Sequence, residues 1–364
     1  MIKVLVFGAG AIGRGYLPWI FPVDTHILDY VESNQTLLEE LRRIEKYTSY
    51  MTKDSSYHQL AIDGCRYFSL TEVNSDLLNS YDFIATAVGP RQFLSLAKLF
   101  QGTDVPIVCF ENDRDLVLKM RLALDRDNIY FGIPDVISSN TSSESISNAS
   151  PMSLITEDGV CFVEEAAQAL AGDVKYVSET EMSRQWAAKL YIHNTPHCIA
   201  AYLGSLAGVT YLHEAMQLPE INRVVRGAAN EMKHTVENIF DLDEDFSQYY
   251  LDKEIARFEN QLLYDPISRI AREPFRKLAL DNRLIGAASF ALSVGVSIEY
   301  LMIGITAAFR YDDSNDPDHH IKPLYTALSK GDFLEIAIGL HKNEPVYRAL
   351  YHNWGKINEY LDEI

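Results

Sequence analysis

Three residues in the stretch WAAKLYIHNTPHCIAAYLG have the types and spacing needed to take a proton from an alcohol. On a helix, Lys189 and His197 lie about two turns apart and Asn194 lies three residues before His197, so these side chains can project toward one cleft. Hydride transfer from an alcohol requires a base for the hydroxyl proton and donors for the developing alkoxide, or a metal doing both. A lysine is a base only when neutral, a form that burial beside apolar neighbours favours. The spacing therefore indicates a lysine base with two orienting donors.

The same stretch also has a purely structural interpretation. A long lysine side chain can carry its amine out to solvent, and Asn194 and His197 can cap a bend at Pro196. A zinc-dependent site is not favoured, because the sequence holds no plausible ligand set and the adjacent pair His319 and His320 is more typical of a surface loop. Spacing alone leaves both interpretations open.

A second group of residues has the spacing of a dinucleotide-binding loop. Gly8, Gly10 and Gly13 form G-x-G-x-x-G between a first apolar run and a helical stretch, which is the context that makes the motif informative. The first glycine permits a tight turn, the second lets the backbone approach a pyrophosphate, and the third lets helix and strand pack closely. The other cofactor-binding residues that we expect are Ala11 and Ile12 in this loop and Val88 in TAVGP.

An acidic residue at the expected distance from the loop favours NAD over NADP. Asp29 follows Gly8 by 21 residues and ends the second apparent strand. A carboxylate there binds the adenosine ribose hydroxyls and repels a 2′-phosphate. The alternative is a glycine turn that only packs strand on helix, with Asp29 as a solvated strand end.

The elements that must position these residues fall into two parts. Up to about residue 177, short β-rich runs alternate with helical stretches, and a Ser/Asn-rich segment, SSNTSSESISNAS, is expected to form an exposed loop. Beyond Glu181 the pattern is helical throughout. The sequence predicts an α/β fold: a Rossmann-type doubly wound parallel sheet in residues 1–180, followed by an all-helical substrate-binding domain in residues 181–364, with Lys189 facing NAD across the cleft between them.

Composition excludes several classes of function. The formal net charge of −19 would repel a polyanion, and we find no basic stripe, so nucleic acid is not an expected partner. The four cysteines are far apart, which indicates reduced thiols in a cytoplasmic protein rather than a disulfide scaffold or a zinc site. The longest uncharged stretch, residues 284–298, is too short for a membrane span.

Five ordered blocks carry a resemblance that covers nearly the whole chain. They are GAGAIGRG, TAVGP, CFEN, KLYIHNTPHCIAAYLG and RFENQLLYDPISRIAREPFRKLALDNRLI. The chain resembles the polyol-specific long-chain dehydrogenase (mannitol dehydrogenase) family. The resemblance implies that Lys189 is the general base of a metal-free reaction, that Asn194 and His197 position the reacting oxygen, and that Asn112 completes an oxyanion-stabilising pair.

Two positions depart from the family pattern. Pro196 stands where the family commonly has glycine, and a proline within a helix removes a backbone hydrogen bond and is expected to kink it. The family motif V-D-R-I appears here as residues 134–137, PDVI, which keep the acid and lose the arginine. Both departures bear on which substrate is bound rather than on the type of reaction.

The substrate is expected to be a polyol or its phosphate. The segment REPFRKLALDNR is a local basic island in an acidic chain, which favours an anionic ligand, although a helix surface with internal ion pairs is an equal alternative. The predicted substrate-binding residues are Arg257 and Asn260, by resemblance, with Arg276 and Lys277. The expected function is interconversion of mannitol 1-phosphate and fructose 6-phosphate, or a close analogue, with NAD by a monomer or homodimer. The alternatives are a dehydrogenase of an uncharged polyol or keto-sugar acid, or a non-catalytic NAD sensor.

Overall fold

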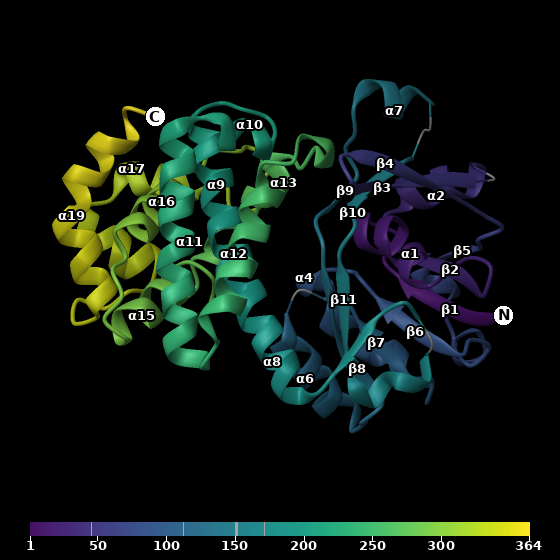
Figure 1. The fold of residues 1–364 in the computed structure, drawn as a ribbon. Coiled ribbons are helices and arrows are strands. Elements are labelled where there is room, and N and C mark those ends of the chain that lie inside the picture. The colour runs from purple at the N-terminus through teal and green to yellow at the C-terminus, as the bar shows by residue number, and fades with distance from the viewer. Residues whose placement is uncertain (45, 112, 150–151, 171) are drawn as a thin grey trace. The chain divides into compact units, whose positions relative to one another are not determined.

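The computed structural model describes residues 1–364 except 45, 112, 150–151 and 171. Contacts divide the chain into two compact units (Figure 1). Unit 1 comprises Met1–Trp186 together with Leu262–Tyr264, and unit 2 comprises Ala187–Gln261 and Asp265–Ile364. The division falls inside the helical stretch that begins at Glu179, a few residues beyond the position expected from the change of sequence pattern. No helix in the described ranges has both the length and the apolar character needed to cross a membrane.

Unit 1 is built on an eight-stranded sheet of order β12-β11-β8-β7-β6-β1-β2-β5. The six strands from β5 to β8 run parallel, as predicted, whereas β11 pairs antiparallel with β8, so the complete sheet is mixed. The strands are β1 (Ile2–Phe7), β2 (His26–Glu32), β5 (Tyr67–Ser69), β6 (Phe83–Thr86), β7 (Ile107–Cys109), β8 (Ile129–Asp135), β11 (Val160–Glu164) and β12 (Lys175–Val177).

The central strands are buried on both faces, which is why they are apolar runs rather than alternating ones. In β1, Leu5 and Phe7 enter one core while Val4 and Val6 enter the other. The helices in this unit are α1 (Leu17–Ile20), α2 (Gln35–Arg43), α3 (Ser75–Leu78), α4 (Pro90–Phe93), α5 (Ala97–Phe100), α6 (Arg114–Leu124), α7 (Glu144–Ala149) and α8 (Glu179–Ala187). Residues of α3 to α6 cover one face, and residues of α1 and α2 cover the other.

Two features of unit 1 differ from the expectation. A second sheet of order β4-β3-β10-β9 contains a hairpin that the sequence did not reveal, and the Ser/Asn-rich segment contains the short helix α7 rather than loop alone (Figure 1). Five of the eight residues of β4 are exposed, so this strand lacks the apolar run by which the other strands were recognised. The second sheet consists of β3 (Lys46–Lys53), β4 (Ser56–Asp63), β9 (Ser138–Ser139) and β10 (Leu154–Glu157).

Unit 2 is helical throughout the part of it that is described, as predicted, and α9 (Asn194–Leu206) lies at its centre. Residues 194–204 are all buried, because α9 packs against α10, α11, α13 and α16. The remaining helices are α10 (Leu212–Gln217), α11 (Pro219–Phe240), α12 (Glu244–Phe258), α13 (Ile267–Ala271), α14 (Pro274–Lys277), α15 (Ile285–Ser293), α16 (Glu299–Phe309), α17 (Ile321–Ala327), α18 (Lys330–Asp332) and α19 (Pro345–Leu361).

Candidate active site

The segment that carries the predicted base is not an ordinary α-helix. Residues Ala188–His193 form a π-helical turn that leads directly into α9, and the backbone N–H of Asn194 donates to the carbonyl of Lys189. In an α-helix, residues five apart point to different faces, whereas the wider π turn brings the fifth residue back toward the first. The π turn therefore gives the K-x4-N spacing a structural reason.

Pro196 lies in the first turn of α9, where a missing N–H is tolerated. The expected effect of this proline was a kink within one continuous helix. The structure instead places a change of helix type immediately before it, from the π turn to the α-helix. The proline thus marks the start of α9 and does not interrupt it.

All three predicted catalytic residues in this segment are buried. The exposed fraction is 5% for Lys189, 4% for Asn194 and 8% for His197, so the lysine does not carry its amine out to solvent as the structural alternative required. The Asn194 Nδ2 atom is buried and has no hydrogen-bond partner within the described residues. Because an unmade hydrogen bond of a buried donor costs about 1–3 kcal/mol, this amide is maintained at the expense of stability.

His197 is held by a carboxylate that sequence reasoning missed. Its Nε2 lies 3.1 Å from Asp265 Oδ2, and Arg269 Nε donates to Asp265 Oδ1 at 2.8 Å. Burial alone would raise the pKa of Asp265, but the Arg269 charge and the His197 hydrogen bond outweigh burial, and the pKa lies below its ordinary value. Burial lowers the pKa of His197, so its imidazole is neutral near pH 7. With Nε2 donating to an ionised carboxylate, the remaining nitrogen, Nδ1, is an acceptor, which corrects the expectation of a second donor.

A second buried carboxylate lies beside the first. Glu254, on α12, receives hydrogen bonds from His193 Nδ1 and from Arg257 Nη1, the latter at 2.8 and 2.9 Å, and Lys253 Nζ lies 3.2 Å away. The rings of His193 and His197 are 4.9 Å apart, and both contact Phe258. His193 and Glu254 were absent from the predicted site, although the spacing of Glu254 and Arg257, three apart on a helix, could have suggested their pairing.

The four predicted substrate-binding residues have different surroundings. Arg257 is buried against Glu254, and Asn260 is half-buried just after α12. Arg276 Nε donates to Glu273 at 2.7 Å, and the buried Lys277 amine donates to the carbonyls of Ile270 and Arg272. Burial lowers the pKa of Lys277 to about 7. Much of the basic island is thus already engaged with groups of unit 2 itself.

The glycine loop has the geometry that its spacing predicted. Gly8 has a φ of +99°, which only glycine adopts readily, and a Cβ on Gly13 would lie 1.9 Å from the Gly8 carbonyl oxygen. A Cβ on Gly10 would meet nothing within 4 Å, so the backbone is open there for a pyrophosphate to approach. Ala11 and Ile12 begin a π-helical turn, Ala11–Tyr16, and are half-buried. These residues fit a dinucleotide.

The acidic residue expected at the ribose is not Asp29. Asp29 lies inside β2, pairs with Leu5 in the middle of β1, and has no exposed surface. Its carboxylate accepts hydrogen bonds from Arg66 Nη2 and Tyr81 Oη, both at 2.7 Å. The strand continues to Glu32, whose carboxylate lies at the carboxyl edge of the sheet and accepts a hydrogen bond of 3.0 Å from Ala9 N in the glycine loop. Glu32, and not Asp29, is therefore the acidic residue at the end of β2, and the error arose from ending the strand three residues early.

The loop after β6 is organised by another missed carboxylate. Glu111 accepts hydrogen bonds from the backbone N–H groups of Val88 and Gly89, at 2.9 and 2.8 Å. Burial raises the pKa of Glu111 above its ordinary value. Val88 therefore lies at the carboxyl end of a parallel strand, as predicted for a cofactor-binding residue. Asn112, the predicted second member of the oxyanion pair, lies outside the described residues.

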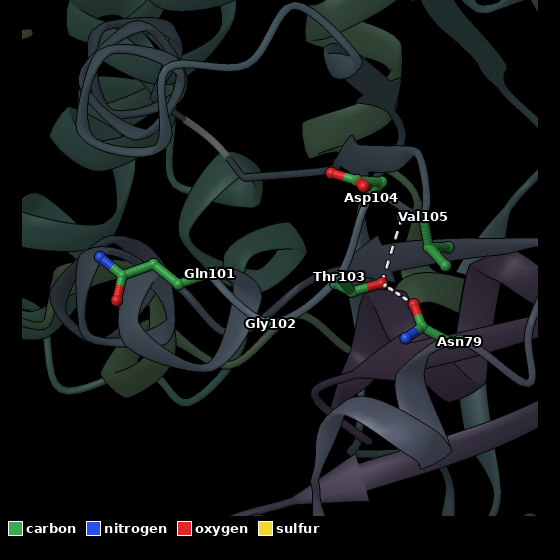
Figure 2. A pocket seen from close by; sticks show the side chains of 6 residues that line it. All are labelled: Asn79, Gln101, Gly102, Thr103, Asp104 and Val105. Carbon is green, nitrogen blue, oxygen red and sulfur yellow. Dashed lines mark hydrogen bonds between the residues drawn. The ribbon is translucent and has the colours of Figure 1, made fainter.

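One cavity of unit 1, of about 500 Å³, does not lie at the carboxyl edge of the sheet (Figure 2). It is lined by Asn79, which precedes β6, and by residues 101–105, which precede β7. Figure 2 shows Thr103 joining the two segments through its hydrogen bond to Asn79, of 2.6 Å. Because ligands of open α/β sheets bind at the carboxyl ends of the strands, this cavity is not the cofactor site. Among the described residues, no group of three or more His, Cys, Asp or Glu side chains could hold a metal ion.

A family profile matches much of the helical part of the chain. Residues 182–330 match the profile of the mannitol dehydrogenase C-terminal domain. The matched region is similar to the C-terminal domain of mannitol dehydrogenases. It begins just before the π turn with Lys189 and includes both buried carboxylates, Glu254 and Asp265.

Similarity to curated relatives extends over both units. The chain is 25% identical over 341 residues to a mannitol-1-phosphate 5-dehydrogenase of Caldanaerobacter subterraneus, covering 87% of this chain and 88% of that protein. It is 26% identical to the enzyme of the same name from Streptococcus mutans, covering 87% and 89%. These similarities confirm the resemblance predicted from the five sequence blocks.

The fold is shared with solved dehydrogenases. Pseudomonas fluorescens mannitol 2-dehydrogenase, in a ternary complex with NAD and D-mannitol, superposes with a TM-score of 0.77 at 14% identity, covering 100% of this chain and 94% of that one. A substrate-free D-sorbitol dehydrogenase gives 0.66 at 15% identity, covering 99% and 92%. The predicted fold class is confirmed.

Proposed function

We propose that this chain is an NAD-dependent polyol phosphate dehydrogenase that interconverts mannitol 1-phosphate and fructose 6-phosphate, or a close analogue, with Lys189 as general base. The coarser part, an oxidoreductase of the polyol dehydrogenase kind with NAD as cofactor, rests on the relatives and on the shared fold. In the finer part, the lysine base rests on residues of this chain, and the phosphate rests on the names of the curated relatives. The observation that carries the lysine base is the buried Asn194 amide donor, which has no partner among the described residues and lies five residues after a buried lysine.

Three polar residues of the segment have a part in the proposed reaction. Lys189, as the neutral amine, takes the proton of the reacting hydroxyl at Nζ. Asn194 Nδ2 donates to the oxygen as negative charge develops there, which is most effective where water is excluded. His197, neutral and fixed by Asp265, accepts at Nδ1 from a substrate hydroxyl and so orients the sugar chain. The chemistry that bound NAD would supply is a hydride acceptor for the carbinol carbon.

The glycine loop and its neighbours fit this cofactor. Gly8, Gly10 and Gly13 provide the turn and the open backbone for the pyrophosphate, and Glu32 offers a carboxylate to the ribose. Val88 and Gly89, held by Glu111, line the neighbouring strand end. A carboxylate at the ribose position favours NAD over NADP by charge repulsion.

The phosphate is the least supported part of the proposal. Two members of the basic island, Arg276 and Lys277, are already bonded to Glu273 and to backbone carbonyls. An uncharged polyol or a keto-sugar acid is therefore the second candidate. NADH oxidation with fructose 6-phosphate, fructose and a ketouronate separates the candidates, and preference for fructose would exclude the phosphate.

The lysine base is tested by Lys189→Ala, with Lys233→Ala as a matched control. Lys233 is another buried lysine of unit 2, 3% exposed and 3.0 Å from Glu237. Turnover should be lost in Lys189→Ala while NADH binding, measured by fluorescence titration, is unchanged. Lys233→Ala should lose stability and keep its kcat. Retained turnover in Lys189→Ala would contradict the proposed mechanism. If the wild-type protein bound NADH tightly but turned over none of the three substrates, the result would support a non-catalytic sensor.

A further inference from the structure

His193 is a buried histidine of the same helical segment to which neither the sequence motifs nor the proposed mechanism gives a role. It has an exposed fraction of 4% and ends the π turn, four residues before His197. Its ring centroid lies 4.9 Å from that of His197 and 5.5 Å from that of Phe258. The two imidazoles therefore form adjacent parts of one buried surface.

The partner of His193 fixes which of its nitrogens carries the proton. Nδ1 is hydrogen-bonded to Glu254, whose carboxylate forms an ion pair with Arg257 through two hydrogen bonds from Nη1. An ionised carboxylate only accepts, so Nδ1 is the donor. Burial also lowers the pKa of His193 to about 4, so the ring is neutral at pH 7. In a neutral ring with a proton on Nδ1, Nε2 is a hydrogen-bond acceptor.

We propose that His193 is a substrate-contacting specificity residue, whose Nε2 accepts a hydrogen bond from a second hydroxyl of the polyol, next to the hydroxyl oriented by His197. The argument rests on the function proposed above. Each imidazole is tied at one nitrogen to a buried carboxylate and keeps an acceptor at its other nitrogen, and the two ring centroids are 4.9 Å apart. Two neighbouring acceptors match the two O–H groups of a vicinal diol, and a simple secondary alcohol can satisfy only one of them.

The pairing predicts how the site selects its substrate. A buried acceptor left without its hydroxyl costs about 1–3 kcal/mol, so an analogue lacking that one hydroxyl should lose about 5- to 150-fold in kcat/KM. The loss should occur at one hydroxyl position, because one nitrogen makes the contact. A residue that only supports the fold would not distinguish between hydroxyl positions.

The experiment compares wild type with His193→Leu and His193→Gln on D-mannitol 1-phosphate and its monodeoxy analogues. His193→Leu should lower kcat/KM on the parent substrate by about 5- to 150-fold and on one analogue hardly at all, because that analogue already lacks the contact. His193→Gln, which keeps an acceptor oxygen, should recover part of the discrimination. Phe258→Leu removes packing from both imidazoles without removing a polar group, and should affect all analogues alike.

A uniform loss across the analogues in His193→Leu would overturn the proposal and assign His193 to support of its neighbours. A failure of wild type to act on any polyol or ketose would be a different result, since it would overturn the proposed function itself. Folding of each variant is checked by circular dichroism and NADH binding, and His193→Gln provides the readout if His193→Leu does not fold.

Discussion

Replacement of Asn194 by alanine should stabilise the protein and remove most of its activity. The buried Nδ2 has no partner among the described residues, so its removal should recover about 1–3 kcal/mol of desolvation free energy. Alanine also has a better helix propensity than asparagine, by up to about 0.7 kcal/mol. Lost packing of the amide offsets part of these gains, which leaves an expected increase of about 1 kcal/mol in the free energy of unfolding. The loss of one oxyanion donor should lower kcat by about 10²- to 10³-fold.

Thr195→Val is the matched control, because the neighbouring hydroxyl is buried and does have a partner. Thr195 Oγ1 donates to the Arg283 carbonyl at 2.7 Å. Its removal should lower the free energy of unfolding by about 1 kcal/mol and change kcat by less than about tenfold. Urea denaturation and steady-state NADH oxidation measure both quantities. If Asn194→Ala were less stable than wild type, or retained its kcat, the amide would be a structural group and the reasoning would be refuted.

Three further predictions concern the cofactor loop and pH. Glu32→Gln should raise the ratio of NADPH to NADH activity by roughly tenfold or more, since it removes the carboxylate beside the ribose position; an unchanged ratio would exclude Glu32. Gly13→Ala would place a Cβ 1.9 Å from a carbonyl oxygen and should lower the free energy of unfolding by about 1–3 kcal/mol. Gly10→Ala, whose Cβ would meet nothing within 4 Å, should leave Tm unchanged and weaken NADH binding. Equal Tm values for the two variants would contradict this prediction. Folding lowers the pKa of His193 from 6.5 to about 4, so between these pH values the unfolded chain binds a proton that the folded chain does not. The free energy of unfolding should therefore fall by up to about 3 kcal/mol as the pH decreases through this window. His193→Gln should flatten that part of the pH profile measured by urea denaturation, and an unchanged profile would contradict the shift.

The predictable parts of the molecule are those governed by local pattern. The parallel strands were found because burial on both faces makes them apolar runs, and the glycine loop because only glycine permits its turn and close packing. The antiparallel β11, the polar hairpin β3–β4 and helix α7 were missed or misassigned, because pairing partners and tertiary support decide them. The residues of the candidate site divide in the same way, into those that a local pattern indicates and those that only tertiary contacts bring in.

Lys189, Asn194 and His197 could be recognised within one segment, but their partners could not. Glu254 and Asp265 follow Lys189 by more than sixty residues, and nothing in their local sequence says that they pair with histidines. The strand end at Glu32 was misplaced because Asp29, a charged residue inside a strand, looked like a terminus. Its burial is possible only because Arg66, distant in sequence, pairs with it.

The two buried carboxylates also determine how charge is distributed when the reaction occurs. Each is paired with one arginine, Glu254 with Arg257 and Asp265 with Arg269, and each holds one histidine. Each carboxylate favours protonation of its histidine, but burial outweighs that effect and lowers the pKa of both rings, which keeps them neutral at pH 7. The imidazoles and the Asn194 amide are therefore fixed dipoles that need no rearrangement as charge develops. In the proposed mechanism Lys189 is then the group of the segment that takes up the proton, as a single general base requires.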